Sequence, residues 1–144
     1  MLSDVIARLA AKVPAFSGRV SGAAGHAEAM EHAPPLSRLP MAFVVPLADA
    51  AEPNTRIGEV CQRLHVHFGV VLVVGPAQAD ALGGPQAVAI EGLRIAVRTA
   101  LLGWQPSWAE TPITATQGQY LGLLNQALWW GDAFTFTITL RGTP

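Results

Sequence analysis

Near the start of the chain, apolar residues recur with the period of an amphipathic helix. One stripe of that helix holds five of them: Val5, Ile6, Leu9, Ala10 and Val13. Ser3 is placed to cap the helix, Asp4 suits its first turn, and Pro14 stops it. A second stretch, "GAAGHAEAMEHAPP", allows another short helix that ends before Pro34.

The pattern then changes to that of two strands joined by a polar loop. "PMAFVVPL" predicts a buried strand over residues 41–47 with a bend near Pro46. Residues 48–58, "ADAAEPNTRIG", have the composition of a loop. "EVCQRLHVHFGVVLVVG" alternates up to Gly69, where we expect a bulge, and continues as an unbroken apolar run over residues 70–74. That run indicates a strand covered on both faces. The two strands and the loop between them together predict an extended hairpin.

The longest helical pattern begins at Gly84-Pro85, because proline suits the first turn of a helix, and Gly103 suits its C-terminal cap. Its apolar set is Val88, Ala89, Leu93, Ala96, Val97, Ala100 and Leu101. The remaining chain reads as strands, and we expect a turn near Gly118 and a break at Gly131-Asp132. Those strands cover residues 113–116, 120–124 and 127–140.

The last strand, within "LWWGDAFTFTITLRG", contains two adjacent tryptophans. Neighbours on a strand point to opposite faces, so both cannot enter one core. Four alternating residues are expected to line the core: Phe134, Phe136, Ile138 and Leu140. Counting by twos, Trp130 joins them and Trp129 faces away, unless a bulge at Gly131-Asp132 exchanges the two. One tryptophan is therefore left over.

The order of these elements predicts the fold class. Helices do not alternate regularly with strands, which disfavours a repeated parallel arrangement. We expect an α+β (α/β) fold, with an antiparallel or mixed sheet of about four to six strands. One long helix and one or two short helices would pack on it. A length of 144 residues fits a single domain over residues 1–144.

Composition adds that the protein has more apolar surface than one small core can hide. Hydrophobic residues make up 51% of the chain and charged residues only 13%, about half the usual share. Such a surface suggests burial in an assembly. With a net charge of −1 and no basic block, tight binding to nucleic acid is not expected. We expect neither a signal peptide nor a membrane span.

Candidate chemistry is sparse. His65 and His67 share one strand face and form a possible metal pair, which needs a third ligand. Cys61 lies on that face but about 13 Å from His65 along a strand. Because it is the single cysteine of the chain, an internal disulfide is excluded. A small metal- or ligand-binding enzyme domain built on these residues stays an alternative. Otherwise we predict no catalytic residues, no metal site and no cofactor.

Four segments of the chain form a recognisable series in their order and spacing: "RLPMAFVVPLADAAEPNT", "CQRLHVHFGVVLVV", "LRIAVRTALLGWQP" and "ALWWGDAFTFTITLRG". They resemble the tail terminator proteins of tailed phages and prophages, including those of gene-transfer-agent-like particles. The N-terminal "VIARLAAKVPAFSGRVSGAA" is also similar. The resemblance covers nearly the whole chain, and none of its pieces is a catalytic motif.

The resemblance implies a non-enzymatic structural protein of the virion tail, assembled in the cytoplasm of the bacterial host. Such proteins form a homo-hexameric ring on the head-proximal end of the tail tube. The ring contacts the major tail tube protein, ends tube polymerisation and offers a docking surface for the head–tail connector or stopper protein. DNA passes through its channel without sequence-specific binding. A head-completion or neck protein is the alternative within the same structural class.

These expectations give a set of interface candidates. The loop over residues 48–58, with Glu52, Asn54 and Arg56, is the candidate for contact with the tube. Tryptophan is enriched at interface hot spots, and four tryptophans exceed the need of one small core. The remaining candidates are Trp104, Trp108, Trp129, Trp130 and Asp132.

Overall fold

A computed structural model describes residues 1–76 and 84–142. The elements in chain order are α1 (Leu2–Lys12), η1 (Pro14–Phe16), β1 (Val20–Ser21), α2 (Ala23–Glu31), η2 (Leu36–Arg38), β2 (Met41–Ala51), β3 (Val60–Val74), α3 (Gly84–Leu101), β4 (Thr114–Leu124) and β5 (Ala127–Gly142). The strand order in the sheet is β1-β2-β3-β5-β4, where β1 runs parallel to β2 and all other neighbours are antiparallel. The predicted α+β class is therefore confirmed, as a five-stranded mixed sheet with three α-helices in the described part of the chain.

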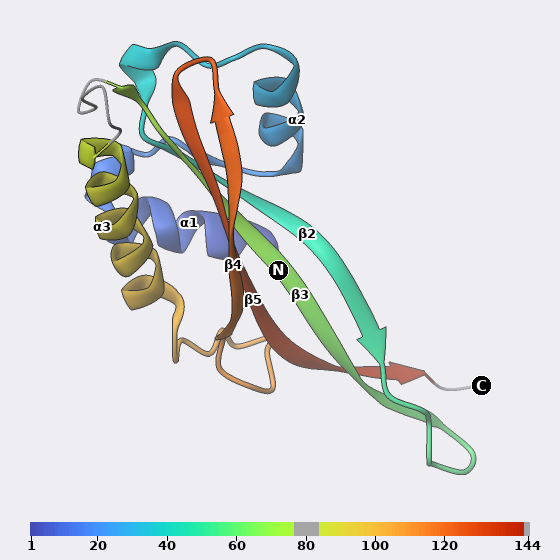
Figure 1. Cartoon of the computed structure of the whole chain (residues 1–144). Helices are drawn as coiled ribbons and strands as arrows, with labels where there is room; N and C mark the ends of the chain where they lie inside the picture. The colour runs from blue at the N-terminus through green and yellow to red at the C-terminus, as the bar shows by residue number, and fades with distance from the viewer. Residues whose placement is uncertain (77–83, 143–144) are drawn as a thin grey trace.

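The sheet buries apolar residues on both faces (Figure 1). Helices α1 and α3 cover one face, where Phe68, Phe134 and Phe136 form an aromatic centre. Helix α2 covers one end of the other face, over Phe43 and Trp129. Residues 70–74 of β3 are buried throughout, which confirms the prediction that this run is covered on both sides.

The first helix differs from its prediction only at its start. Val5, Leu9 and Val13 are fully buried, as the stripe predicts. Ser3, however, lies inside α1, and Met1 occupies the capping position without a side-chain hydrogen bond. The prediction of a Ser3 cap is wrong because the backbone N–H of Asp4 bonds the carbonyl of Met1, so the first turn begins earlier.

The hairpin of β2 and β3 is longer than predicted. β2 continues through residues 48–51, so the connecting loop is confined to residues 52–59. The irregularity in pairing lies between Pro46 and Ala48 of β2, and Gly69 pairs regularly with both neighbouring strands. The expected bulge is thus on the other strand, beside the proline that has no N–H to donate. We call residues 47–64 the arm, since they project beyond the helices together with the end of β5 (Figure 1).

Strands β4 and β5 form a second continuous hairpin. The predicted turn near Gly118 and break at Gly131-Asp132 are both wrong, because Gly118 pairs directly with Asp132 within one ladder. The turn lies at Asn125 and Gln126, whose φ angles of 50° and 68° suit a two-residue hairpin loop. Register shifts at Ala115/Gln117 and Tyr120/Gly122 place two bulges in β4.

Helix α3 begins at Gly84 and is followed by Gly103 with a φ of +81°, as its sequence predicts. The buried stripe is rotated from the predicted one, because Val88 is 70% exposed and Ile90 is buried beside Leu93 and Val97. Leu140 of β5 is also exposed, against expectation, because the strand has by then left the helices and entered the arm. In the part of the chain that the structure describes, no helix is long and apolar enough to cross a membrane.

Candidate assembly surfaces

Asn54 organises the loop at the end of the arm. Its Nδ2 donates hydrogen bonds to the carbonyl oxygens of Arg56 at 3.2 Å and Glu59 at 3.1 Å. Its Oδ1 accepts one from the backbone N–H of Cys61 at 3.0 Å. A single side chain therefore joins both sides of the loop, which explains why an asparagine stands here.

The tip of this loop presents an apolar side chain beside an ion pair. Ile57 is fully exposed. Next to it, Arg56 Nη1 lies 2.9 Å from Glu59 Oε1, and the hydrogen bond to Glu59 raises the pKa of the Arg56 guanidinium. Sequence reasoning picked out Arg56 and missed Ile57, although an isoleucine inside a polar loop was the available signal.

Glu52 is anchored to the sheet, in contrast to Arg56. Its Oε1 lies 3.0 Å from His65 Nε2, and His65 Nδ1 lies 3.2 Å from the hydroxyl of Thr137. The backbone N–H of Glu52 also bonds the carbonyl of Arg63. These contacts connect the end of β2 to β3 and β5, and they engage one of the two histidines proposed for a metal.

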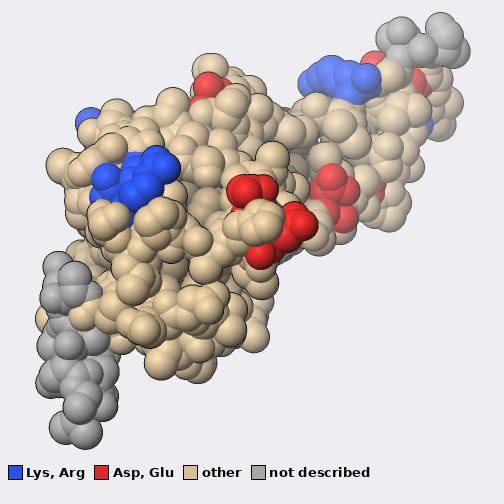
Figure 2. All heavy atoms as spheres, turned by 90° about the horizontal axis from the view of Figure 1, so that it is seen from above, with Lys and Arg blue, Asp and Glu red and all other residues tan. Residues whose placement is uncertain are grey.

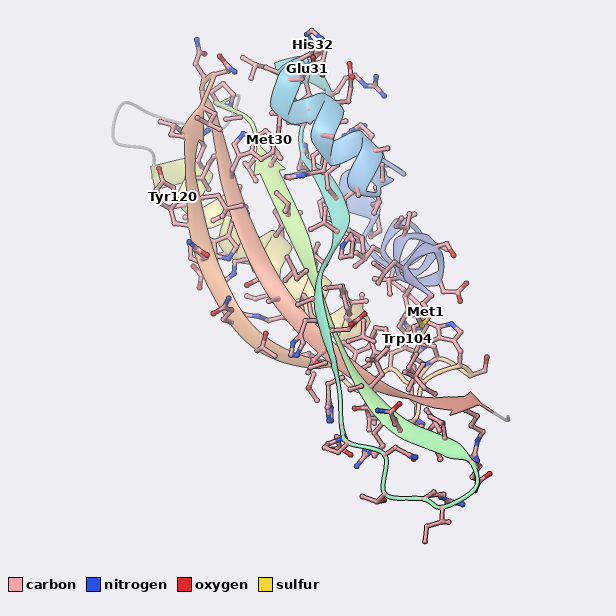
Figure 3. The ribbon with its side chains drawn as sticks, turned by 90° about the vertical axis from the view of Figure 1, so that its right-hand side faces the viewer. Met1, Met30, Glu31, His32, Trp104 and Tyr120 are labelled. Atoms are coloured by element: carbon pink, nitrogen blue, oxygen red, sulfur yellow. The ribbon has the colours of Figure 1, made fainter. Side chains whose placement is uncertain are left out.

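Among the described strands, β4 lies at a border of the sheet and pairs only with β5. Its eleven residues contain no charged side chain, and all but Gly122 are exposed. Its exposed large apolar residues are Tyr120, Leu121, Leu123 and Leu124. Figure 3 shows Tyr120 at this outer border. Such an edge offers unpaired N–H and C=O groups to another strand. Sequence reasoning missed it, because which strand lies at an edge depends on the tertiary pairing.

Trp104 and Trp108 are half-buried in the connection between α3 and β4. The Arg8 guanidinium lies 4.6 Å from the centre of the Trp104 ring, and Trp108 Nε1 donates to Asp4 at 2.6 Å. The Trp108 ring meets Phe136 edge-on at 4.9 Å. Both rings therefore join α1 to the rest of the body (Figure 3 labels Trp104), and part of each stays at the surface.

The other two tryptophans lie on opposite faces of the sheet. Trp129 is only 4% exposed and stacks on Phe43 with ring centres 6.3 Å apart. Trp130 packs on the α3 side, under the guanidinium of Arg94 at 4.2 Å, and donates to Asp132 at 3.2 Å. The parity count is confirmed, since no bulge interrupts β5. Trp129, which faces away from the core under α1 and α3, belongs to a second core under α2.

Asp132 is held inside the protomer at 3% exposure. Arg94 donates to both of its carboxylate oxygens, from Nε at 3.0 Å and from Nη2 at 3.0 Å. Arg98 approaches it at 3.9 Å and keeps 40% of its own side chain exposed. The side chains of Asp132 and Trp129 thus have little surface left for a partner.

The described residues include no group of three or more His, Cys, Asp or Glu side chains arranged to hold a metal. His65 is engaged by Glu52 and Thr137, and Cys61 is a free thiol four residues away along β3. Charged side chains are few and scattered on the face shown in Figure 2, and several lie on the projecting arm.

A model of the family described as "Phage tail terminator protein" matches residues 1–144. The chain belongs to this family. None of the curated proteins matches it. The family is structural and non-enzymatic, which excludes the alternative of a small enzyme domain built on His65 and His67. Membership makes the chain a component of the phage tail that associates with the tail tube.

Proposed function

We propose that this tail terminator closes as a hexameric ring on the head-proximal end of the tail tube. The ring would end tube polymerisation and provide the surface on which the head's connector docks. DNA would pass through its channel without sequence-specific contacts, consistent with a net charge of −1. Family membership supports the association with the tube, while the ring and the docking are inferences.

The observation that carries the proposal is the arm. It projects beyond the helices (Figure 1), and its loop carries Ile57, whose side chain is fully exposed. An apolar anchor beside a charged pair is typical of an interface hot spot with a polar rim. We assign the contact with the last ring of the tube to this tip, with Arg56 at its rim.

The position of the arm at one end of the subunit explains how a terminator can stop the growth of the tail tube. A tube lengthens because each ring presents a surface that accepts the next ring. A subunit whose tube-binding surface is concentrated in one arm matches the tube at one end and presents a different surface at the other. Growth then ends without a chemical step, because the next tube subunit no longer finds its partner surface.

The proposal is tested by assembling tails with altered arm tips and measuring tail lengths by electron microscopy. Ile57→Asp and Arg56→Ala should give overlong tubes while the purified proteins keep their thermal stability. Ile95→Asp, at an exposed site on α3, is the matched control and should give normal lengths. Normal tail lengths with all arm variants would refute the assignment of the arm to the tube.

Electron microscopy of particles with the protein labelled separates the head-completion alternative from the terminator. A terminator binds the end of head-free tubes, whereas a neck protein binds tail-free heads. Labelling of heads alone would replace the proposed function with the alternative.

A further inference from the structure

The sheet has two open borders of different character. On one side, β4 is an uncharged, exposed edge strand. On the other side, β1 pairs only with Ala42 and Phe43, so the outer border of β2 has no strand partner in the described chain from residue 44 onward. A protein with two different open borders can join its copies head to tail.

Charge is distributed unequally between these borders. β4 has no charged residue, but the hollow beside it, of about 230 Å³, is lined by Arg98 together with Ala115 and Gly118. Arg98 is the outermost of the two arginines around Asp132 and is the more exposed of them. The outer half of β2 carries Asp49, an exposed carboxylate with no ion pair among the described residues.

These opposite charges lie on the same face of the sheet. Asp49 pairs with Val66, a residue of the core under α1 and α3, so its side chain points to that face. On β4, Ala115 pairs with Phe134 and Gly118 with Asp132, both on the α3 side. The bulge between residues 115 and 117 keeps both β4 residues on this face.

We propose that the β4 edge of one copy pairs with the outer edge of β2, residues 47–51, of a second copy, and that Asp49 of one copy meets Arg98 of the other. This deepens the ring proposed above and rests on it. The sheet then continues from copy to copy, and the exposed Tyr120 is covered by the neighbouring arm.

Cysteine pairs test this contact directly, on a Cys61→Ser background with tube present. Asp49→Cys with Ala115→Cys should form a ladder of disulfide-linked oligomers. Within one copy, β3 and β5 separate the two sites by roughly 14 Å, beyond disulfide reach. Ala50→Cys with Ala115→Cys is the matched control, because Ala50 points to the opposite face, and it should lose the ladder.

Charge reversal provides the second test. Asp49→Arg and Arg98→Glu should each lose rings, and the double variant should regain them. A melting curve shows whether Arg98→Glu still folds, since it places a carboxylate near Asp132. If Arg98→Glu unfolds, the cysteine pairs alone test the pairing of β4 with β2 of a second copy. Rings without the ladder would overturn the edge pairing and leave the ring intact. Tubes capped by single copies without rings would overturn the proposed function itself.

Discussion

Trp129 and Trp130 are consecutive in the chain, yet their rings belong to two different cores on opposite faces of one sheet. Trp130 has its indole N–H satisfied by Asp132, whereas the N–H of Trp129 is buried with no hydrogen-bond partner among the described residues. A buried donor without a partner opposes folding by about 1–3 kcal/mol. The two residues therefore differ in how substitution should affect stability.

Trp129→Phe should change the free energy of unfolding by less than about 1 kcal/mol. Phenylalanine keeps the stacking on Phe43 and removes the unpaired donor, which offsets part of the lost area. Trp129→Ala should cost about 3–5 kcal/mol by leaving a cavity under α2. Urea denaturation of both variants measures the difference, and a loss of about 3 kcal/mol for Trp129→Phe would show that the N–H has a partner in solution.

Arg94→Met should destabilise the protein by about 3 kcal/mol, because it leaves the buried Asp132 carboxylate with only the distant Arg98. Arg94→Met combined with Asp132→Leu should recover much of that loss, since no buried charge remains. The measurement is a double-mutant cycle by chemical denaturation. Additive losses would mean that the ion pair contributes little.

Two glycine-to-alanine substitutions should change the stability of the protein in opposite directions. A Cβ at Gly118 would lie 2.6 Å from both Arg94 Nη2 and Asp132 Oδ1, so Gly118→Ala should displace the ion pair and cost about 1–3 kcal/mol. Gly92 lies within α3 with nothing within 4 Å of such an atom, so Gly92→Ala should stabilise by about 0.5–1 kcal/mol. Thermal melting compares them, and a stabilising Gly118→Ala would contradict the packing described above.

Asn54→Ala should loosen the arm tip without changing the global melting temperature. It removes the acceptor for the Cys61 N–H and the donor for two loop carbonyls. Hydrogen exchange at the Cys61 amide should accelerate by roughly tenfold, the equivalent of about 1.4 kcal/mol of local stability. Asn125→Ala, in the turn between β4 and β5, is a comparison variant that should leave this amide unaffected.

Local pattern was sufficient for much of the fold. The stripe of α1 and the parity of Trp129 and Trp130 follow from helical and strand periods alone, and both agree with the structure. The prediction of turns failed where contacts between residues far apart in the sequence determine the strand pairing. Gly118 was predicted to lie in a turn, but it lies opposite Asp132 because only a glycine leaves room for Arg94 there.

The candidate surfaces were harder to predict for a related reason. Glu52, Asn54 and Arg56 were recognised from loop composition, but their structural roles differ, since Asn54 holds the loop, Glu52 binds His65 and Arg56 pairs with Glu59. The β4 edge was not predicted at all. Its position at the border follows from β5 inserting between β3 and β4, a pairing between segments far apart in the sequence.

The continuous path of β3 through body and arm has a mechanical consequence. Its fifteen residues span roughly 50 Å, and β5 runs beside it over the same distance, with no break in pairing between the aromatic core and the tip. Because this pairing contains no break, we expect the arm and the body to move as one stiff unit. A force applied at the arm would then tilt the whole body, so that contact at one end of the subunit would reorient the surface at the other.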